Sequence, residues 1–334
     1  MTAAADHALA YQELQPDDIL DSVESLGLRC DGRLQPLNSY ENRVYQVGLE
    51  DDRPVVAKFY RPGRWSDEAI LEEHAFAFEL AARDLPVVTP IRHAGTSLHR
   101  HGEFRFSVSP RVAGRIPELD DLDLLRQIGR LVGRIHLCGA GDRFQHRPRL
   151  TPARLGAASR DYLLEQDFIP EHVEAAYRSL CRDLLGAVED AFERVGAREL
   201  RLHGDFHPGN VLVHDGQVHI VDLDDCATGP AVQDLWMFLS GGRAEQEPQL
   251  AELLAGYLEF RDFDPAELQL VEALRTLRIM HYAAWIARRW RDPAFRIAFP
   301  WFGAPRYWEE HVLSLREQLA LLQEPSLDWL PPAG

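Results

Sequence analysis

The segment from His203 to Asn210 has the residue types and the spacing that phosphoryl transfer requires. Asp205 is followed by four residues and then by Asn210, so one short loop carries a carboxylate and a neutral amide. A carboxylate can orient an attacking hydroxyl and accept its proton, and an amide oxygen is a suitable ligand for hard Mg²⁺. Gly204 and Gly209 allow the tight backbone that such a loop needs. The alternative is a polar surface turn whose carboxylate has no chemical role.

A predicted hairpin follows this loop and ends in three carboxylates. An Asp-Gly pair, a strong turn signal, lies between the Val-rich runs 211–213 and 218–221. The second run leads into the acidic sequence 222–225, where like charges need a cation or solvent to compensate them. Folding back of the hairpin would bring Asp222 beside Asn210. The pattern therefore predicts a magnesium site built from these two residues.

The acidic residues have simpler alternatives. Asp222 could be a solvated strand end. Asp224 and Asp225 could form a solvated acidic turn or could support the site from behind, and the sequence leaves both possibilities open.

Two histidines flank the candidate catalytic carboxylate. His203, Asp205 and His207 alternate with other residues, and His and Asp both ligate zinc. A metallohydrolase would leave Lys58, Asn210 and the hairpin without a role, however. We therefore expect both histidines to form hydrogen bonds and to shape the loop.

The hydrophobic pattern changes along the chain and predicts two subdomains. The first 110 residues combine a helix over 16–26 and a helix from Ser66 to Arg83 with extended segments. The extended segments are 43–49 and 54–60, expected as an antiparallel hairpin, and 96–99 and 104–110. From Gly114 onward helical periodicity dominates, interrupted by the hairpin after Asn210. The expected helices start at Leu122 and cover 152–164, 172–195, 244–260, 265–289 and 307–323.

Composition restricts the class of protein. The chain has 334 residues and a formal net charge of −17, which disfavours non-specific binding to nucleic acid or to anionic membranes. The four cysteines form no Cys-x-x-Cys pair, so we expect neither a zinc cluster nor a disulfide framework. Residues 1–10 lack the pattern of a signal peptide, and no apolar run approaches about 18 residues. We expect a soluble, cytoplasmic monomer.

The motifs together resemble a known family. The quoted segments are His203-Gly204-Asp205-x-His207-Pro208-Gly209-Asn210-x-Leu212, Val221-Asp222-Leu223-Asp224-Asp225 and Gly229-Pro230-x-x-x-Asp234-Leu235. They are similar to the aminoglycoside phosphotransferase and choline kinase branch of the kinase-like fold. That resemblance implies an α+β, bilobal protein-kinase-like fold with a small, β-rich nucleotide-binding lobe, 1–110, and a larger helical lobe, 111–334, for catalysis and substrate.

Further segments resemble bacterial Ser/Thr protein kinases that act in stress response. They include Leu37-Asn38-Ser39-Tyr40-Glu41-Asn42-Arg43-Val44-Tyr45, Lys58-Phe59-Tyr60-Arg61-Pro62 and Arg289-Trp290-x-Asp292-Pro293-Ala294-Phe295. The likeness extends from about residue 14 to residue 325. It implies ATP and Mg²⁺ as cofactors, a protein substrate with a Ser or Thr acceptor, and self-phosphorylation.

The resemblance also implies a role for each candidate residue. Asp205 would be the catalytic base, and Asp222 would take the place of the Asp in the Asp-Phe-Gly motif of protein kinases. Asn210 and Asp222 would bind magnesium. The nucleotide-binding residues would be Ser39, in the loop over the phosphates, Lys58, on the α- and β-phosphates, and Glu73, paired with Lys58. Asp234 would brace the catalytic loop from behind.

Two of these roles have a physical check in the sequence. Lys58 ends a Val-Val-Ala-Lys run similar to the strand that carries the nucleotide-binding lysine of protein kinases. An interior strand lysine needs a counter-charge, for which Glu73 is preferred over Glu72. The segment 37–44 departs from the usual pattern because it contains no glycine, so backbone contacts to phosphates would come from 39–42.

The acceptor is not determined by these residues. The C-terminal helices offer aromatic and basic side chains, namely Arg275, Arg278, His281, Tyr282, Trp285, Arg288, Arg289, Trp290, Trp301, Tyr307 and Trp308. A cationic amine would favour aromatic and acidic groups instead, whereas basic groups could receive a phosphorylated segment. Most of the aromatics could equally be core. A small-molecule kinase for an amino alcohol, aminoglycoside or sugar, and an inactive scaffold, are the alternatives to a protein kinase.

Overall fold

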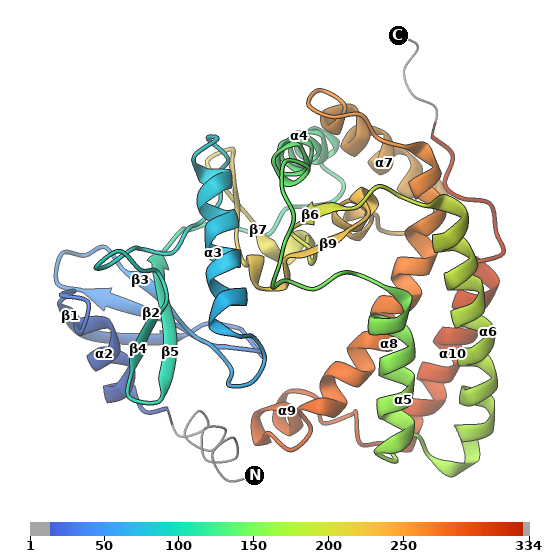
Figure 1. Cartoon of the computed structure of the whole chain (residues 1–334), viewed down its shortest axis with the longest axis horizontal. Coiled ribbons are helices and arrows are strands. Elements are labelled where there is room, and N and C mark those ends of the chain that lie inside the picture. Colours follow the sequence, from blue (N-terminus) through green and yellow to red (C-terminus); the bar gives the residue numbers. More distant parts are fainter. Residues whose placement is uncertain (1–13, 330–334) are drawn as a thin grey trace. The chain divides into compact units, whose positions relative to one another are not determined.

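The computed structural model describes residues 14–329 and divides them into two compact units (Figure 1). The first unit comprises 14–117, 144–147 and 208–226, and the second comprises 118–143, 148–207 and 227–329. A five-stranded antiparallel sheet is combined with many helices, so the α+β class predicted from the sequence is confirmed. The prediction about a signal peptide at 1–10 lies outside the described residues.

The first unit is built on a five-stranded antiparallel sheet in the order β1-β2-β3-β5-β4. Its strands are β1 (Cys30–Pro36), β2 (Arg43–Leu49), β3 (Val55–Phe59), β4 (His99–His101) and β5 (Phe104–Pro110). The β2–β3 hairpin was predicted and is confirmed, whereas β1 was not predicted. The exposed, polar composition of β1 explains the omission, because it lacks an apolar alternation.

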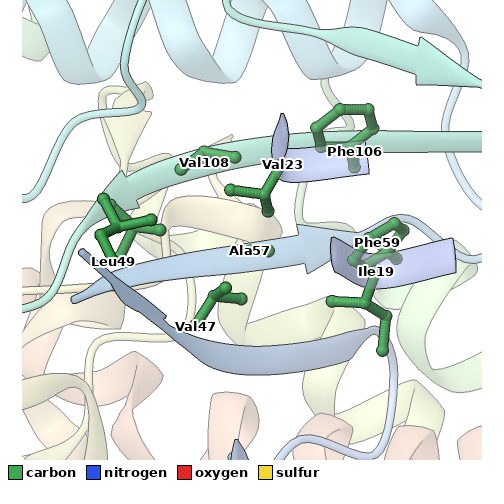
Figure 2. Close-up of a cluster of buried hydrophobic side chains, with 9 residues drawn as sticks. Ile19, Val23, Val47, Leu49, Ala57, Phe59, Phe106 and Val108 are labelled. Atoms are coloured by element: carbon green, nitrogen blue, oxygen red, sulfur yellow. The ribbon is translucent and has the colours of Figure 1, made fainter. Parts of the chain in front are cut away.

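Helix α2 (Pro16–Glu24) covers one face of this sheet. Figure 2 shows Ile19 and Val23 of α2 gathered with buried side chains of β2, β3 and β5. In β3 the buried residues of this cluster alternate, at Val55, Ala57 and Phe59. Since successive side chains of a strand point to opposite faces, Lys58 emerges on the face away from α2.

Helix α3 (Asp67–Ala81) follows β3 and begins where the sequence predicted. The Ser66 hydroxyl accepts a hydrogen bond from the backbone N–H of Ala69, and two acidic residues in the first turn complement the helix dipole. Glu73 and His74 are buried on this helix. α3 contacts the short 3₁₀ turn η3 (Leu223–Asp225), which places acidic residues of the same unit near it.

The hairpin β7 (Val211–His214) and β8 (Gln217–Ile220) forms as predicted, with both turn residues left-handed (Asp215 φ 47°, Gly216 φ 74°). It packs in the first unit, where Val88 N–H donates to the Ile220 carbonyl at 2.9 Å. The division into a nucleotide-binding lobe, 1–110, and a lobe for catalysis and substrate, 111–334, stays a prediction. Packing alone groups this hairpin with the N-terminal sheet, although it lies far away in sequence.

The second unit is mainly helical and contains one small sheet. Its helices are α4 (Leu122–Gly139), α5 (Ala158–Glu165), α6 (Glu171–Val195), α7 (Arg243–Tyr257), α8 (Val271–Arg288), α9 (Pro293–Ala298) and α10 (Pro305–Leu321). Shorter turns precede α5 and α8, namely η1 (Ala153–Ala157) and η6 (Pro265–Leu270), so two expected helices have irregular first turns. Figure 1 shows α5, α6, α8 and α10 side by side, and they pack on one another.

The expectation of a single strand pair in the C-terminal part was wrong. β6 (Leu200–Leu202) pairs with β9 (Ala227–Gly229) in an antiparallel ladder of the second unit. β6 leads directly into His203, and α4 packs against β6. Gly139 permits this approach, since a Cβ there would lie 2.1 Å from the carbonyl oxygen of Arg201. Strands of three residues carry too little alternation to be predicted from sequence.

None of the helices described here is both long enough and apolar enough to cross a membrane.

Candidate active site

Lys58 is the centre of a charged cluster in the first unit. Its Nζ lies 2.9 Å from Asp222 Oδ1 and 3.1 Å from Asp224 Oδ1. Burial lowers the pKa of Lys58, but the carboxylates of Asp222, Asp224 and Glu73 outweigh burial and hold that pKa well above its usual value. Lys58 is therefore a fixed cation, largely buried, at the point where the resemblance expects a phosphate-binding lysine.

Glu73 does not form the expected ion pair with Lys58. The two groups interact electrostatically, yet the ion pairs of Lys58 within 4.0 Å go to Asp222 and Asp224. Burial raises the pKa of Glu73 to about 7, although the Lys58 charge opposes that rise. Glu73 Oε2 is buried without a hydrogen-bond partner among the described residues. The carboxyl thus sits beside the cluster with spare hydrogen-bonding capacity.

Glu72, the competing choice, is engaged elsewhere. One of its oxygens accepts the backbone N–H of Gln145 at 2.6 Å, and the other accepts those of His146 and Arg147, both at 2.8 Å. Three donors saturate this carboxylate and tie the segment 144–147 to α3. Of the two neighbouring glutamates, Glu73 is the one that acts on Lys58.

Asp224 is the most surrounded carboxylate of the cluster, with a side chain only 5% exposed. It accepts hydrogen bonds from Asn42 Nδ2 at 3.0 Å and from Arg64, besides its pairing with Lys58. Burial raises its pKa, but the charges of Lys58, Arg64 and Arg147 prevail and hold the pKa well below its usual value. Arg147 also donates to the backbone carbonyls of Asp224 and Cys226. The sequence left the role of Asp224 undecided. In the structure its carboxylate is the anion that Lys58, Arg64 and Asn42 all contact.

The glycine-free loop 37–44 is held by arginine contacts. Arg61 donates to the carbonyl oxygens of Glu41 at 2.9 Å and Tyr40 at 3.3 Å. The Asn42 side chain also accepts the N–H of Arg61, so this buried amide bridges the loop to the segment just after β3 and to Asp224. No residue of the loop has a positive φ, which explains how it forms without glycine. Ser39 lies in this loop and is partly exposed.

Asn210 and Asp222 come together at the open end of the β7–β8 hairpin. The Asn210 carbonyl accepts the N–H of Val221 at 3.1 Å, and Asp222 is the next residue. Asp222 has a left-handed backbone (φ 60°, ψ 67°), a strained conformation that clusters at functional sites, and its side chain is 52% exposed. One amide and one accessible carboxylate fit Mg²⁺, which usually takes few protein ligands and completes its shell with phosphates and water.

The zinc alternative finds no support in the geometry. Among residues 14–329, no three His, Cys, Asp or Glu side chains converge as a metal site. His203 is fully buried and packs on Phe206, with ring centroids 4.9 Å apart. His207 instead lies beside Asp205, with Nε2 at 3.4 Å from Oδ2.

Asp205 belongs to the second unit, where Arg278 of α8 binds it. Arg278 Nη1 lies 2.5 Å from Asp205 Oδ1. Burial raises the pKa of Asp205, but His207 and Arg278 outweigh burial and hold that pKa well below its usual value. Asp205 is consequently ionised across the neutral range. Arg278 appeared in the sequence only as one of several basic residues, and nothing local linked it to Asp205.

Asp234 braces the backbone that carries Asp205, as expected. Its two carboxylate oxygens accept the N–H groups of His203 and Gly204, each at 2.8 Å. His136 of α4 lies 3.1 Å from the same carboxylate, and all of these groups are buried. Gly204 has φ 85°, so the loop turns in a left-handed conformation that favours glycine.

The sequence model of the phosphotransferase enzyme family matches residues 33–271, most of the chain. The chain belongs to this family. Stress response kinase A of Escherichia coli (strain K12) is 45% identical over 324 residues, which are 97% of this chain and 98% of that protein. Serine/threonine protein kinase RdoA of Salmonella typhimurium is 43% identical over 98% of this chain and 99% of its own length. The protein is thus an enzyme, a kinase.

Two solved kinase structures share its fold. Amicoumacin kinase, solved with AMP-PNP, Ca²⁺ and Ami, superposes with a TM-score of 0.68 at 17% identity, over 90% of this chain and 92% of its own. Spectinomycin phosphotransferase, solved with ADP and spectinomycin, gives 0.64 at 15% identity, over 91% and 99%. These likenesses confirm the predicted kinase-like fold. The roles of Ser39, Lys58, Glu73, Asp205, Asn210 and Asp222 stay predictions.

Proposed function

We propose that this kinase transfers the γ-phosphoryl group of ATP to Ser or Thr hydroxyls of proteins, itself included, in a stress response. The observation that carries the proposal is the identity of 43–45%, over nearly the whole chain, with relatives named as a stress response kinase and a Ser/Thr protein kinase. The charged cluster around Lys58 supports a nucleotide, because a fixed cation beside Asn210 and Asp222 suits a metal-bound polyphosphate.

Each residue of the cluster has a role in this proposal. Lys58 exchanges a carboxylate for the α- and β-phosphates, and Ser39 belongs to the loop that covers them. Asn210 and Asp222 hold Mg²⁺, which when bound neutralises charge on the phosphates. Glu73 balances the Lys58 charge from α3.

Asp205 handles the acceptor hydroxyl. In the transfer, the bond between the γ-phosphorus and the bridging oxygen of ATP breaks, and a bond from phosphorus to the acceptor oxygen forms. The hydroxyl proton passes to Asp205, and ADP leaves. Since the pKa of Asp205 is depressed, its first task is to orient the hydroxyl, and the proton moves late, as a loose transition state permits.

Labelled ATP tests this function. Wild-type protein is incubated with γ-labelled ATP and Mg²⁺, alone and with a mixture of protein and small-molecule acceptors. We expect label on the protein itself and on protein acceptors, and a loss of about 1,000-fold in Asp205→Ala with nucleotide affinity retained. Asp215→Asn, in an exposed hairpin turn, serves as the matched control. Label confined to amino alcohols, aminoglycosides or sugars would overturn the proposal.

A further inference from the structure

The charge of the second unit is unevenly distributed along the chain. Residues 273–308, which cover most of α8, α9 and the start of α10, contain seven arginines and one acidic residue, Asp292. The whole chain has a net charge of −17. Asp292 is buried and its carboxylate accepts the N–H of Ala294 at the start of α9. Glu272 and Glu310, just outside this segment, pair with Arg275 and Arg306.

One face of α8 carries two arginines, a histidine and two aromatic residues. The five residues are Arg278, His281, Tyr282, Trp285 and Arg288. Each of them has another of the five three residues away, so they share a side of the helix. Tyr282 is exposed and stacks on Trp285, with ring centroids 5.7 Å apart. We call these five residues the α8 face.

Positive charge is concentrated around His281. Burial, and after it the charges of the arginines at 154, 288, 289 and 278, lower the pKa of His281 to about 3. His281 is therefore neutral, and the guanidinium groups that act on it electrostatically belong to α8, to Arg289 just after α8 and to η1. A positive field of this kind attracts anions and repels cationic amines.

Arg288 has no carboxylate to neutralise it. It is exposed, donates to the carbonyl of Ala158 at 3.2 Å, and lies over the Tyr162 ring, 4.9 Å from the centroid. None of the carboxylates in the described part of the chain forms an ion pair with it. Arg296, near the end of α9, likewise donates to a carbonyl, that of Trp290, rather than to an acid.

Arg278 connects this field with the candidate catalytic carboxylate. Its side chain is 46% exposed, and its ion pair is with Asp205. An acceptor hydroxyl that approaches Asp205 competes with Arg278 for the same oxygens. A negative group near that hydroxyl would give the guanidinium a new partner, so the exchange would cost little.

We propose that the α8 face binds an acceptor segment that carries negative charge next to its Ser or Thr, and that Arg278 exchanges Asp205 for that charge. The inference rests on the proposed protein kinase function and specifies its substrate class as an anionic peptide. The charge can come from Asp and Glu or from an already phosphorylated residue, since both present oxygens that a guanidinium binds in the same way.

Four Ser-containing peptides that differ only in the residues flanking the serine provide the test. The flanking residues are Asp, phosphoserine, Asn or Lys, and kcat/KM is measured with Mg²⁺ and ATP. We expect the wild type to prefer the Asp or the phosphoserine peptide over the Asn peptide by about 10-fold or more, and to discriminate further against Lys. The Asp and phosphoserine arms show which source of charge is favoured. Added salt should reduce the preference.

Variants identify the residues responsible. Arg288→Ala should reduce the preference for the anionic peptides, Arg278→Gln should abolish most of it, and Arg278→Lys should restore part of it. Arg178→Ala, which removes a surface arginine paired with Glu174 on α6, is the matched control and should keep the wild-type preference. If Arg278→Gln does not fold, Arg288→Ala and the order of the wild-type kcat/KM values for the four peptides still test the proposal.

Two failures are distinguishable. Equal kcat/KM values for all four peptides, or a preference for the Lys peptide, overturn the anionic acceptor while leaving a protein kinase intact. Absence of label on every peptide and on the protein, with small amines or sugars labelled, overturns the proposed function itself.

Discussion

The charged cluster around Lys58 in the first unit and the surroundings of Asp205 in the second unit differ in how their charges are balanced. In the first, Lys58 and Arg64 face Asp222, Asp224 and Asp225 at short distances, and the central members are buried. In the second, Asp205, the proposed catalytic carboxylate, meets an exposed arginine, and further arginines lie on and near α8.

This difference suggests a division of labour. A cluster in which cations and carboxylates lie in close pairs contributes to folding, and its Lys58 can turn from a carboxylate to a phosphate. A region whose positive charges outnumber its negative charges attracts an anion. Changes in the first region should therefore affect stability and nucleotide binding, and changes in the second should affect pH profile and acceptor choice.

The largest expected effect concerns Asp222. Asp222→Ala should reduce kcat/KM for ATP by about 1,000-fold and remove the Mg²⁺ dependence of nucleotide binding, because a proposed ligand of the metal is lost. Titration of nucleotide affinity against Mg²⁺ checks this. Asp225→Ala, at a half-exposed neighbour, is the control and should retain the dependence. An unchanged Mg²⁺ dependence in Asp222→Ala would refute the assignment.

Asp224 should matter most for stability. Asp224→Asn should lower the free energy of unfolding by about 3 kcal/mol, since it leaves the buried cations Lys58 and Arg64 without their shared counter-charge. The matched change Asp225→Asn should cost less than about 1 kcal/mol. Urea unfolding of both variants measures the difference. Because the pKa of Asp224 is depressed in the folded state, its contribution is present near neutral pH and is lost as pH falls below its ordinary value of 3.8.

Glu73 should have the opposite pH dependence. Its folded pKa of about 7 lies above the ordinary 4.5, so the native state binds the proton more tightly than the unfolded chain. Stability from this group is therefore full below 4.5 and declines as pH rises to about 7. Glu73→Gln should remove that decline, on the order of 3 kcal/mol, whereas Glu72→Gln should not. Melting temperatures between pH 4.5 and pH 8 distinguish the two; parallel profiles for wild type and Glu73→Gln would contradict the expectation.

The smallest expected effect is that of Arg278→Gln on the pH profile of kcat/KM, measured with a peptide whose flanking residues are neutral. Arg278→Gln removes one of the groups that hold the pKa of Asp205 low, so that pKa should rise toward its ordinary value. The acidic limb of the profile of kcat/KM against pH should then move to higher pH. Arg178→Gln provides the control. A limb that stays in place would mean that the ion pair does not control Asp205.

Short-range chemistry made much of this molecule predictable from its sequence. The cap at Ser66, the left-handed Asp215-Gly216 turn and the hairpin β2–β3 depend on neighbours within a few residues, and each forms as expected. The spacing of Asp205 and Asn210 on one loop likewise follows from the chain itself. Strands of three residues, β6 and β9, fell below what alternation can indicate.

Tertiary structure alone decided which charges meet. Lys58 pairs with Asp222 and Asp224 rather than with Glu73, although all of these were candidates by residue type. Arg64 reaches Asp224 across 160 residues of chain, and Arg278 reaches Asp205 across 73. Sequence patterns determine local conformation because backbone sterics and capping act over a few residues. The partner of a buried charge depends on which elements pack together, and no local spacing records that.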